Sequence, residues 1–349
     1  MNAPIKGRGA LTNRRSRYLA TSHDPEPAED AGEPARHPAT VVHTEAARTI
    51  ISRNTSPDVP FSQSINPYRG CEHGCIYCFA RPSHARLGHS PGLDFETQLY
   101  AKPRAAALLD AELRRPGYVP EVIHLGANTD PYQPLERDYR ITRQLLEKLL
   151  EFGHPVTVLT KSALVLRDLD LLAELGRRRL TRVYLSITTL DGELKRTLEP
   201  RTASAAARLR AVAALAAAGV PTGVMVAPVI PAVNDHELEA ILAAAAAAGA
   251  RRAGWILLRL PLEVAALMEE WLAAHRPLAA ARVMSLVRDA RGGRANDPRF
   301  GHRMRGHGAY AELLARRFAT AARRLGLAHE AEPLDATQFR PPSPQYTLF

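Results

Sequence analysis

The sequence predicts an α/β fold in which about six parallel strands and their helices form a partial (β/α)6 TIM-like barrel or a doubly wound sheet. Short runs of apolar and β-branched residues alternate with longer helical stretches, which is the pattern of repeated βαβ units. Such units pair their strands in parallel through right-handed connections. About six repeats are fewer than the eight that close a barrel, so we expect an open arrangement.

The expected elements follow one another between residues 62 and 260. We expect strands at 62–66, 122–126, 156–160, 182–188, 222–230 and 254–260, and helices between them at 135–152, 165–179, 203–218 and 235–248. Gly153, Gly219 and Gly249 each follow one of these helices, where glycine commonly ends a helix. In both kinds of α/β sheet, ligands bind at the carboxyl ends of the strands.

The chain divides into four expected segments. Residues 1–45 begin with basic residues and continue into an acidic, proline-containing stretch with little to bury, so we expect a disordered tail. Residues 46–275 hold the partial barrel. Residues 276–330 form an Arg/Gly-rich segment and a C-terminal helix packed on the barrel, and residues 331–349 form a flexible tail.

The net charge of +10 arises from 46 Lys and Arg residues against 36 Asp and Glu residues, and only five of the basic residues are lysines. A GC-rich genome also produces arginine in place of lysine, so the total charge alone does not indicate a nucleic-acid surface. The clustering of arginine is more informative. Between residues 276 and 305, only Asp289 and Asp297 oppose eight arginines, and this window is a candidate for binding a polyanion.

The sequence also bears on the compartment. It contains no run approaching the roughly 18 apolar residues of a transmembrane helix, and its N-terminus lacks the apolar segment of a secretory signal. We therefore expect a cytoplasmic protein with no membrane association.

All three cysteines of the chain, Cys71, Cys75 and Cys78, lie in one short loop with Cys-x3-Cys-x2-Cys spacing. This odd number in one loop disfavours disulfides and favours a metal or redox site in a reducing compartment. Thiolates select iron–sulfur clusters or zinc, and zinc would need a fourth ligand such as His73 or His84. The alternative to an enzyme is a non-catalytic nucleic-acid-binding protein stabilised by zinc or by a cluster.

The cysteine motif, with Tyr77 directly before Cys78, resembles that of the radical S-adenosylmethionine (SAM) superfamily. The resemblance implies a partial barrel of the radical SAM type and a [4Fe–4S] cluster held by Cys71, Cys75 and Cys78. It implies reductive cleavage of SAM and hydrogen abstraction from a substrate, with Tyr77 lying against the adenine. It also implies a small reductant protein, a flavodoxin or a ferredoxin, as partner.

A narrower resemblance rests on Asn-Pro-Tyr-Arg-Gly at 66–70, Asn-Thr-Asp-Pro-Tyr-Gln-Pro-Leu-Glu at 128–136, Thr-Lys-Ser at 160–162 and Pro-Val-Ile-Pro at 228–231. These segments are similar to those of the spore photoproduct lyase-like group. The similarity implies DNA or a nucleic-acid component as substrate. It implies SAM contacts through Thr129, Asp130, Lys161 and Ser186, which lie at or just beyond the carboxyl ends of expected strands.

The chain departs from the lyase at the two positions that return hydrogen to its product. The lyase uses a cysteine just before its Thr/Ser-Asp motif and a tyrosine after the third cluster cysteine. This chain has Ala127 and Phe79 there, and neither carries an S–H or O–H group. We therefore expect that the protein does not repair spore photoproduct by the lyase's route.

Two further features have open interpretations. Glu199 and Arg201 either cap a helix or face the mouth of the barrel. The last five residues resemble the Gln-x-x-Leu-Phe peptide with which bacterial replication and repair proteins bind the DNA sliding clamp, through Gln345, Leu348 and Phe349. A tail of this kind supplies reach for such a peptide.

Overall fold

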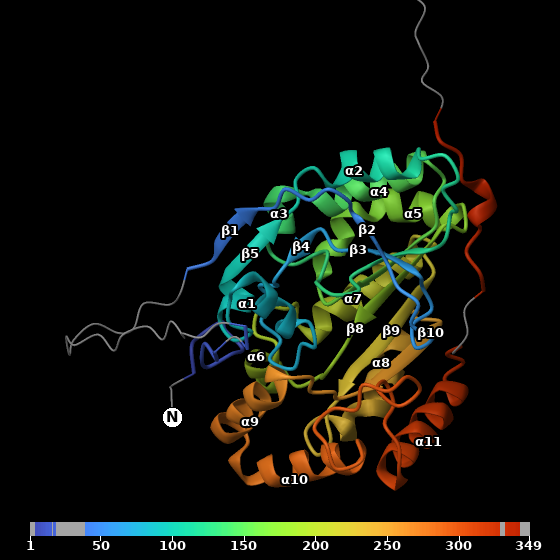
Figure 1. Ribbon diagram of the computed structural model, residues 1–349. Helices are drawn as coiled ribbons and strands as arrows, with labels where there is room; N and C mark the ends of the chain where they lie inside the picture. The colour runs from blue at the N-terminus through green and yellow to red at the C-terminus, as the bar shows by residue number, and fades with distance from the viewer. Residues whose placement is uncertain (1–3, 16, 19–38, 329–331, 343–349) are drawn as a thin grey trace, which may run out of the picture.

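The structure is a computed structural model that describes residues 4–15, 17–18, 39–328 and 332–342. A seven-stranded sheet in the order β10-β9-β8-β7-β6-β3-β2 lies at its centre (Figure 1). The strands from β3 to β10 pair in parallel, and β2 pairs antiparallel with β3. Their bounds are β2 (Ile51–Arg53), β3 (Gln63–Ile65), β6 (Ile123–Leu125), β7 (Val156–Thr160), β8 (Thr181–Ser186), β9 (Thr222–Val229) and β10 (Arg252–Leu257).

This sheet confirms the predicted fold class. Its parallel part has six strands, and β10 at one edge does not pair back to the other edge, so the barrel is open. Helices α4 (Ile141–Glu151), α5 (Leu169–Arg177), α7 (Ala205–Ala217) and α8 (Leu238–Ala247) connect the successive strands β6 to β10. The carboxyl ends of the parallel strands therefore meet at one end of the barrel, where a ligand is expected.

The structure describes further helices besides these four. The remaining helices are α1 (Asp94–Thr97), α2 (Ala105–Leu113), α3 (Glu136–Tyr139), α6 (Gly192–Leu198), α9 (Glu263–His275), α10 (Pro277–Asp289) and α11 (Ala309–Arg324). Helix α11 packs against α8 and β10, so the C-terminal helix lies on the barrel, as in Figure 1.

The expected helix at 135–152 is broken into α3 and α4. Arg140 separates them with a φ of 51°, in the left-handed region. The carboxylate of Glu136 accepts hydrogen bonds from the backbone N–H of Thr142 (3.0 Å) and Arg143 (3.4 Å) and thus caps α4. The expected helices at 165–179 and 235–248 begin instead with the 3-10 turns η2 (Ala163–Asp168) and η3 (Asp235–Glu237).

A second, small sheet has the order β1-β5-β4 and is absent from the expectations. Its strands are β1 (Val41–Thr44), β4 (Tyr68–Arg69) and β5 (Gln98–Ala101). Strand β4 leads directly into the cysteine loop, and Cys71 N–H donates to the carbonyl of Phe95 just before β5 (2.9 Å). The small sheet therefore fixes where the cysteine loop starts.

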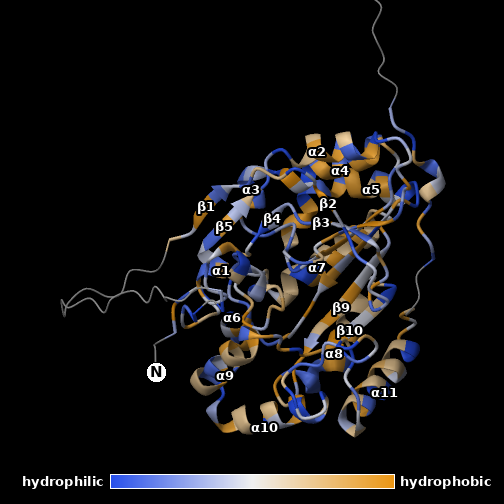
Figure 2. Ribbon diagram, viewed as in Figure 1, coloured by the Kyte–Doolittle hydropathy of each residue, from blue (hydrophilic) through white to orange (hydrophobic). Residues whose placement is uncertain are grey.

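The two largest buried apolar clusters of the described residues stabilise the fold. The larger joins the central strands to the covering helices, with residues such as Leu145, Val158 and Trp255. The smaller joins Ile76 of the cysteine loop to Trp271 of α9. Figure 2 shows hydrophobic residues along the central strands and on the helices over them, as expected for a parallel sheet with both faces covered.

The N-terminal residues differ from the expected disordered tail. Gly9 and Ala10 donate their backbone N–H groups to the Glu96 carboxylate (3.0 and 2.9 Å), and Arg14 pairs with Glu270 of α9 (2.6 Å). A Cβ at Gly9 would lie 1.8 Å from the carbonyl oxygen of Gly74, so this close approach requires glycine. The segment was expected to be disordered because backbone contacts leave no apolar pattern in the sequence.

The described part of the C-terminal segment also packs on the barrel. The ring of Phe339 lies 5.4 Å from that of Tyr118 and 5.5 Å from that of His154, and Arg340 N–H donates to the carbonyl of Phe152 (2.9 Å). The proposed clamp-binding residues Gln345, Leu348 and Phe349 lie outside the described residues. Within the described part of the chain, no helix is long and apolar enough to span a bilayer.

The Arg-rich window is mostly engaged within the protein. Arg291 donates to four backbone carbonyls, including those of Leu257 and Leu258 at the end of β10 (2.9 and 3.0 Å). Arg303 pairs with Asp58 (2.5 Å), and Arg288 pairs with Glu269 of α9 (3.0 Å). A count of arginines along the chain therefore overstates the free positive surface of this window.

Candidate functional site

The cysteine loop runs from Gly70 to Ala80, between β4 and the 3-10 turn η1 (Arg81–Leu87). Its turns are closed by hydrogen bonds from Gly74 N–H to the Cys71 carbonyl (3.3 Å) and from Cys78 N–H to the Cys75 carbonyl (3.2 Å). Gly70 has a φ of +71°, and a Cβ there would lie 2.5 Å from Leu99. Glycine is therefore required where the loop begins.

A buried ion pair anchors the middle of the loop. Arg81 and Glu96 are fully buried, with 2.5 Å between their charged groups. The Arg81 guanidinium also donates to the carbonyl of Cys75 (2.9 Å) and to that of Gly92 (2.8 Å). Because each charge is also hydrogen bonded to the backbone, the pair positions the loop without leaving a buried charge uncompensated.

Gln133, from the 128–136 segment, anchors the start of the loop. Its side-chain oxygen accepts the N–H of Glu72 (3.0 Å), and its amide nitrogen donates to the carbonyl of Gly70 (3.2 Å). Gln133 is fully buried. One role of this segment is thus to hold the cysteine loop at the carboxyl end of β6, a role that the sequence alone did not reveal.

The three thiols lie in an apolar setting. Cys71 and Cys75 are buried, and Cys78 is partly exposed. Burial raises the pKa of Cys71 well above its ordinary value and raises the pKa of Cys75 to about 12.

Asp130 links the loop to the ends of two strands. Its carboxylate accepts hydrogen bonds from Thr160 Oγ1 (2.6 Å) and Lys161 N–H (2.8 Å), and it lies 3.3 Å from His73 Nδ1. Burial alone would raise the pKa of Asp130, but His73 and the hydrogen bonds lower it to about 2. The carboxylate is therefore ionised and already fully engaged within the protein.

Thr129 is engaged in the same way. Its hydroxyl donates to the carbonyl of Tyr68 (2.9 Å), and its backbone N–H donates to the side chain of Asn66 (3.2 Å). The Asn66 oxygen also accepts the N–H of Asn128 (2.9 Å). The two segments that begin at Asn66 and Asn128 are thus bonded to each other, and they fix the turn after β6.

Lys161 lies between the cysteine loop and a buried carboxylate. Its Nζ is 5.6 Å from the centre of the Tyr77 ring. Burial would lower the pKa of Lys161, but Cys75 and Glu199 outweigh burial and raise it. The phenol of Tyr77 donates to Glu199 (2.5 Å).

Glu199 therefore faces the mouth of the barrel rather than serving only as a helix cap. It is fully buried and pairs with Arg208 of α7 at 2.5 Å. Arg208 also donates to the carbonyl of Ser186 (2.8 Å), which ends β8 as a buried residue. Arg201 instead turns to Glu72 of the loop (2.8 Å).

The site also contains a residue that sequence reasoning missed. Arg259 follows β10, and its guanidinium lies 4.8 Å from the centre of the Phe79 ring, next to Cys78. The Nε atom of Arg259 is buried and has no hydrogen-bond partner among the described residues. Phe79 is 44% exposed. The sequence places Arg259 inside the expected strand at 254–260, whereas the observed strand β10 ends at Leu257 and leaves Arg259 just beyond it.

The two candidate zinc histidines differ in how they are engaged. His73 contacts Asp130. The Nε2 atom of His84 lies 2.7 Å from the carbonyl oxygen of Gln98, whereas its Nδ1 atom is buried and has no hydrogen-bond partner among the described residues.

A family model for the radical SAM superfamily matches residues 65–245, a range that contains the cysteine loop and strands β4 to β9. The chain belongs to the radical SAM superfamily. Enzymes of this superfamily use a [4Fe–4S] cluster and SAM, and the Cys-x3-Cys-x2-Cys motif is present here.

The radical SAM protein has several relatives of similar sequence. It is 41% identical over 232 residues to the uncharacterised protein Rv2578c of Mycobacterium tuberculosis, covering 66% of this chain and 68% of the relative. It is 27% identical over 180 residues to the radical SAM Nalpha-GlyT isomerase of Pseudomonas phage M6, covering 51% of this chain and 35% of that protein.

The fold is that of a solved radical SAM enzyme. A variant of spore photoproduct lyase superposes with a TM-score of 0.57 over 82% of this chain and 80% of the lyase, at 18% identity. The protein is therefore a radical SAM enzyme with the fold of spore photoproduct lyase.

Proposed function

We propose that this radical SAM enzyme abstracts hydrogen from a nucleic-acid component, with Cys71, Cys75 and Cys78 holding the [4Fe–4S] cluster. Three thiols on one anchored loop, two of them buried, support this donor set. When bound, the cluster supplies one electron that cleaves SAM to methionine and a 5′-deoxyadenosyl radical. The surrounding residues bind SAM, hold it in place and keep the site buried.

Five residues form the proposed SAM-binding part of the site. Lys161 places an ammonium next to Cys75 and has no carboxylate within 4.0 Å among the described residues, so it can pair with the SAM carboxylate. Ser186 offers a buried hydroxyl, and Tyr77 offers its ring to the adenine. The Thr129 hydroxyl already donates to the carbonyl of Tyr68 in β4, and the Asp130 carboxylate already accepts hydrogen bonds from Thr160 and Lys161, so we assign both residues to positioning.

The observation that carries the proposed substrate is the pair formed by Phe79 and Arg259. An exposed aromatic ring beside a guanidinium can stack on a base and pair with a phosphate. Arg259 has no carboxylate partner among the described residues, and burial lowers its pKa, so its burial has a cost that an anionic ligand would offset. The pair lies next to Cys78, where the substrate must meet the radical.

The protein does not use the lyase's hydrogen-return route in this proposal. Ala127 and Phe79 occupy the two positions and have no labile hydrogen to give. We therefore predict that purified, reconstituted protein does not convert a synthetic spore photoproduct dinucleotide to thymine. Clean conversion of that dinucleotide would contradict this part of the proposal.

The proposed setting is cytoplasmic, with a flavodoxin or ferredoxin as electron donor, because the family needs a low-potential reductant. Binding to the DNA sliding clamp through Gln345, Leu348 and Phe349 stays a prediction. Deletion of Leu348 and Phe349 should abolish capture by the clamp if that prediction holds, and unchanged capture would refute it.

The test of the substrate class is binding of a fluorescently labelled single-stranded oligonucleotide to cluster-loaded protein, measured by anisotropy over a range of salt concentrations. We expect Arg259→Gln and Phe79→Ala each to weaken binding about tenfold, since a stacked base or a phosphate contact contributes about 1–3 kcal/mol. Arg259→Gln should also reduce the salt slope by about one. The matched control is Arg210→Gln, an exposed arginine of α7.

The same oligonucleotide should raise the rate of 5′-deoxyadenosine release in the wild type and not in Phe79→Ala. Two results would contradict the proposal. One is equal binding by both variants and the Arg210→Gln control. The other is tight binding by the wild type with no effect on 5′-deoxyadenosine release, which fits a nucleic-acid-binding role without action on the bound strand.

A further inference from the structure

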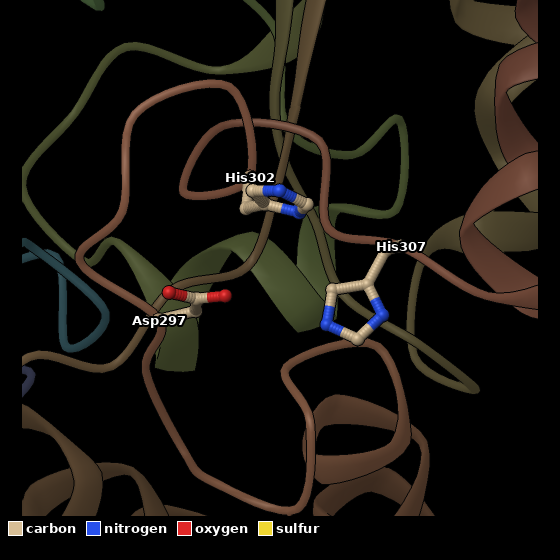
Figure 3. Close-up of side chains that lie close together, drawn as sticks. All are labelled: Asp297, His302 and His307. Carbon is tan, nitrogen blue, oxygen red and sulfur yellow. The ribbon is translucent and has the colours of Figure 1, made fainter.

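A second group of metal-ligating side chains lies outside the cysteine loop. Asp297, His302 and His307 each offer one ligand atom, and these atoms lie within 4.8 Å of one another (Figure 3). All three residues belong to the loop between α10 and α11. This loop belongs to the Arg/Gly-rich segment that the sequence predicts at 276–330. Its three ligand residues are not part of the radical SAM site described above.

Unsatisfied chemistry within the group points to a ligand. The Nε2 atom of His307 is buried and has no hydrogen-bond partner among the described residues. Buried polar atoms almost always have a hydrogen-bond partner, so a bound ligand would supply the partner that this nitrogen lacks. Figure 3 shows a ring nitrogen of His307 directed toward Asp297 and His302, and the two imidazoles meet edge to face with centroids 5.5 Å apart.

Asp297 is held in place but keeps capacity to bind a cation. It is buried, and its carboxylate accepts hydrogen bonds from the Arg299 side chain (2.7 Å) and backbone N–H (3.1 Å). The side chain of Arg299 is 65% exposed, so its ion pair is weak and easily exchanged. A carboxylate has about four lone-pair sites, and the positively charged neighbour does not occupy all of them.

We propose that Asp297, His302 and His307 bind one divalent transition-metal ion, with zinc as the best match. Two imidazoles and a carboxylate are ligands that zinc favours, and a water molecule would complete a tetrahedral set. Ligand atoms around zinc lie roughly 3.3 Å apart, so small side-chain rotations from the present positions complete the site. The site is separate from the cysteine loop and does not depend on the proposed substrate.

The position of the site indicates its role. The loop from 290 to 308 has no regular secondary structure and contains several glycines with positive φ. Its conformation therefore depends on contacts outside the backbone ladder of a helix or sheet. It packs on the barrel through Met304, whose carbonyl accepts the N–H of Leu257 (2.9 Å) and whose sulfur lies 3.6 Å from Arg259. A metal ion within this loop would fix the wall against which Arg259 is placed.

The test is the zinc content of anaerobically purified full-length protein that carries its full cluster, about four irons per chain, so that the cysteines are already occupied. We expect about one zinc per chain in the wild type and less than a tenth of that in the His302→Ala/His307→Ala variant. The matched control is His236→Ala, whose imidazole is exposed and outside the group. Zinc lost equally from the control, or kept by the double variant, would overturn the proposal.

A second measurement covers the case in which the double variant does not fold. Asp297→Asn preserves the size of the side chain, and we expect it to weaken zinc binding at least tenfold in competition with a chromophoric chelator. Removal of zinc from the wild type should also speed trypsin cleavage after Arg294 and Arg299, without loss of iron. Unchanged zinc affinity in Asp297→Asn, or cleavage that zinc does not slow, would refute the site.

Discussion

At the scale of single residues, Glu199 shows what the sequence could not decide. The sequence leaves a helix cap and a place at the barrel mouth equally open. The structure buries Glu199 against Tyr77, a residue 122 positions away, and against Arg208. Chain-distant contacts of this kind leave no local pattern, so no spacing rule could have revealed them. The cysteines, in contrast, lie within one short loop, and their grouping is visible in the sequence itself.

The buried Glu199–Arg208 pair leads to a stability prediction. Glu199→Gln leaves the Arg208 guanidinium buried without a counter-charge, which costs about 3–5 kcal/mol when a buried pair is broken. Urea unfolding of the variant should show that loss of free energy of unfolding. Glu193→Gln, at an exposed position of α6, should change it by less than about 0.5 kcal/mol. Equal effects of the two changes would show that the pair does not stabilise the fold.

At the scale of elements, the sequence predicts the strands of the central sheet better than it predicts the small sheet or the break between α3 and α4. The runs at 156–160 and 222–230 match β7 and β9 closely because their apolar patterns are dense. Strands β4 and β5 have two and four residues and no such pattern, so the small sheet was missed. The break at Arg140 was missed because Glu136 creates it through its side chain, while the apolar periodicity continues across it.

The turn after β6 provides a test of how closely the elements meet. A Cβ at Gly126, whose φ is +97°, would lie 2.2 Å from the carbonyl oxygen of Leu159 in β7. Gly126→Ala should therefore combine backbone strain of about 1–3 kcal/mol with a clash that separates the strands. Gly219→Ala is the control, since Gly219 also has a positive φ but nothing lies within 4 Å of its Cβ position.

Thermal unfolding should show a clearly larger fall in Tm for Gly126→Ala than for Gly219→Ala. Both variants place alanine at a positive φ and are destabilised by that backbone strain. The difference between their Tm values therefore measures the effect of the close approach to Leu159. An equal fall in Tm would mean that β6 and β7 do not approach as closely as described.

At the scale of the whole molecule, the partial barrel and its family were predicted, and the packing of the chain ends was not. Gly9 and Ala10 donate their backbone N–H groups to the carboxylate of Glu96, and Phe339 packs on the opposite end through a single aromatic ring. Composition reports such segments as polar or proline-rich and therefore suggests disorder. Their contacts depend on surfaces that exist only after the barrel has formed.

The stability of the whole molecule should depend on pH through buried histidines. Burial lowers the pKa of His124 to about 4, below the value of about 6.5 in an unfolded chain. Between these values the unfolded state binds more protons, so the contribution of His124 to stability is complete above about pH 6.5 and is lost as the pH falls toward 4. From pH 7 to pH 5 this loss amounts to about 2 kcal/mol.

Comparison with a variant isolates this effect from other titrating groups. His124→Gln cannot titrate, so its free energy of unfolding in urea should fall by about 2 kcal/mol less than that of the wild type between pH 7 and pH 5. Burial also lowers the pKa of His154 to about 4. His154 is present in both proteins, so its contribution to the pH dependence cancels in the comparison. Parallel losses in the two proteins would show that His124 is not buried as a neutral group.

The central claim is that Cys71, Cys75 and Cys78 hold the cluster with which this protein cleaves SAM. The most direct test is the release of 5′-deoxyadenosine from SAM by anaerobically reconstituted protein with dithionite as reductant. We predict a brown protein that releases 5′-deoxyadenosine, and loss of both iron and product when any one of the three cysteines is changed to alanine. A colourless protein that holds zinc on these cysteines, or a cluster-loaded protein that releases no 5′-deoxyadenosine, would contradict it.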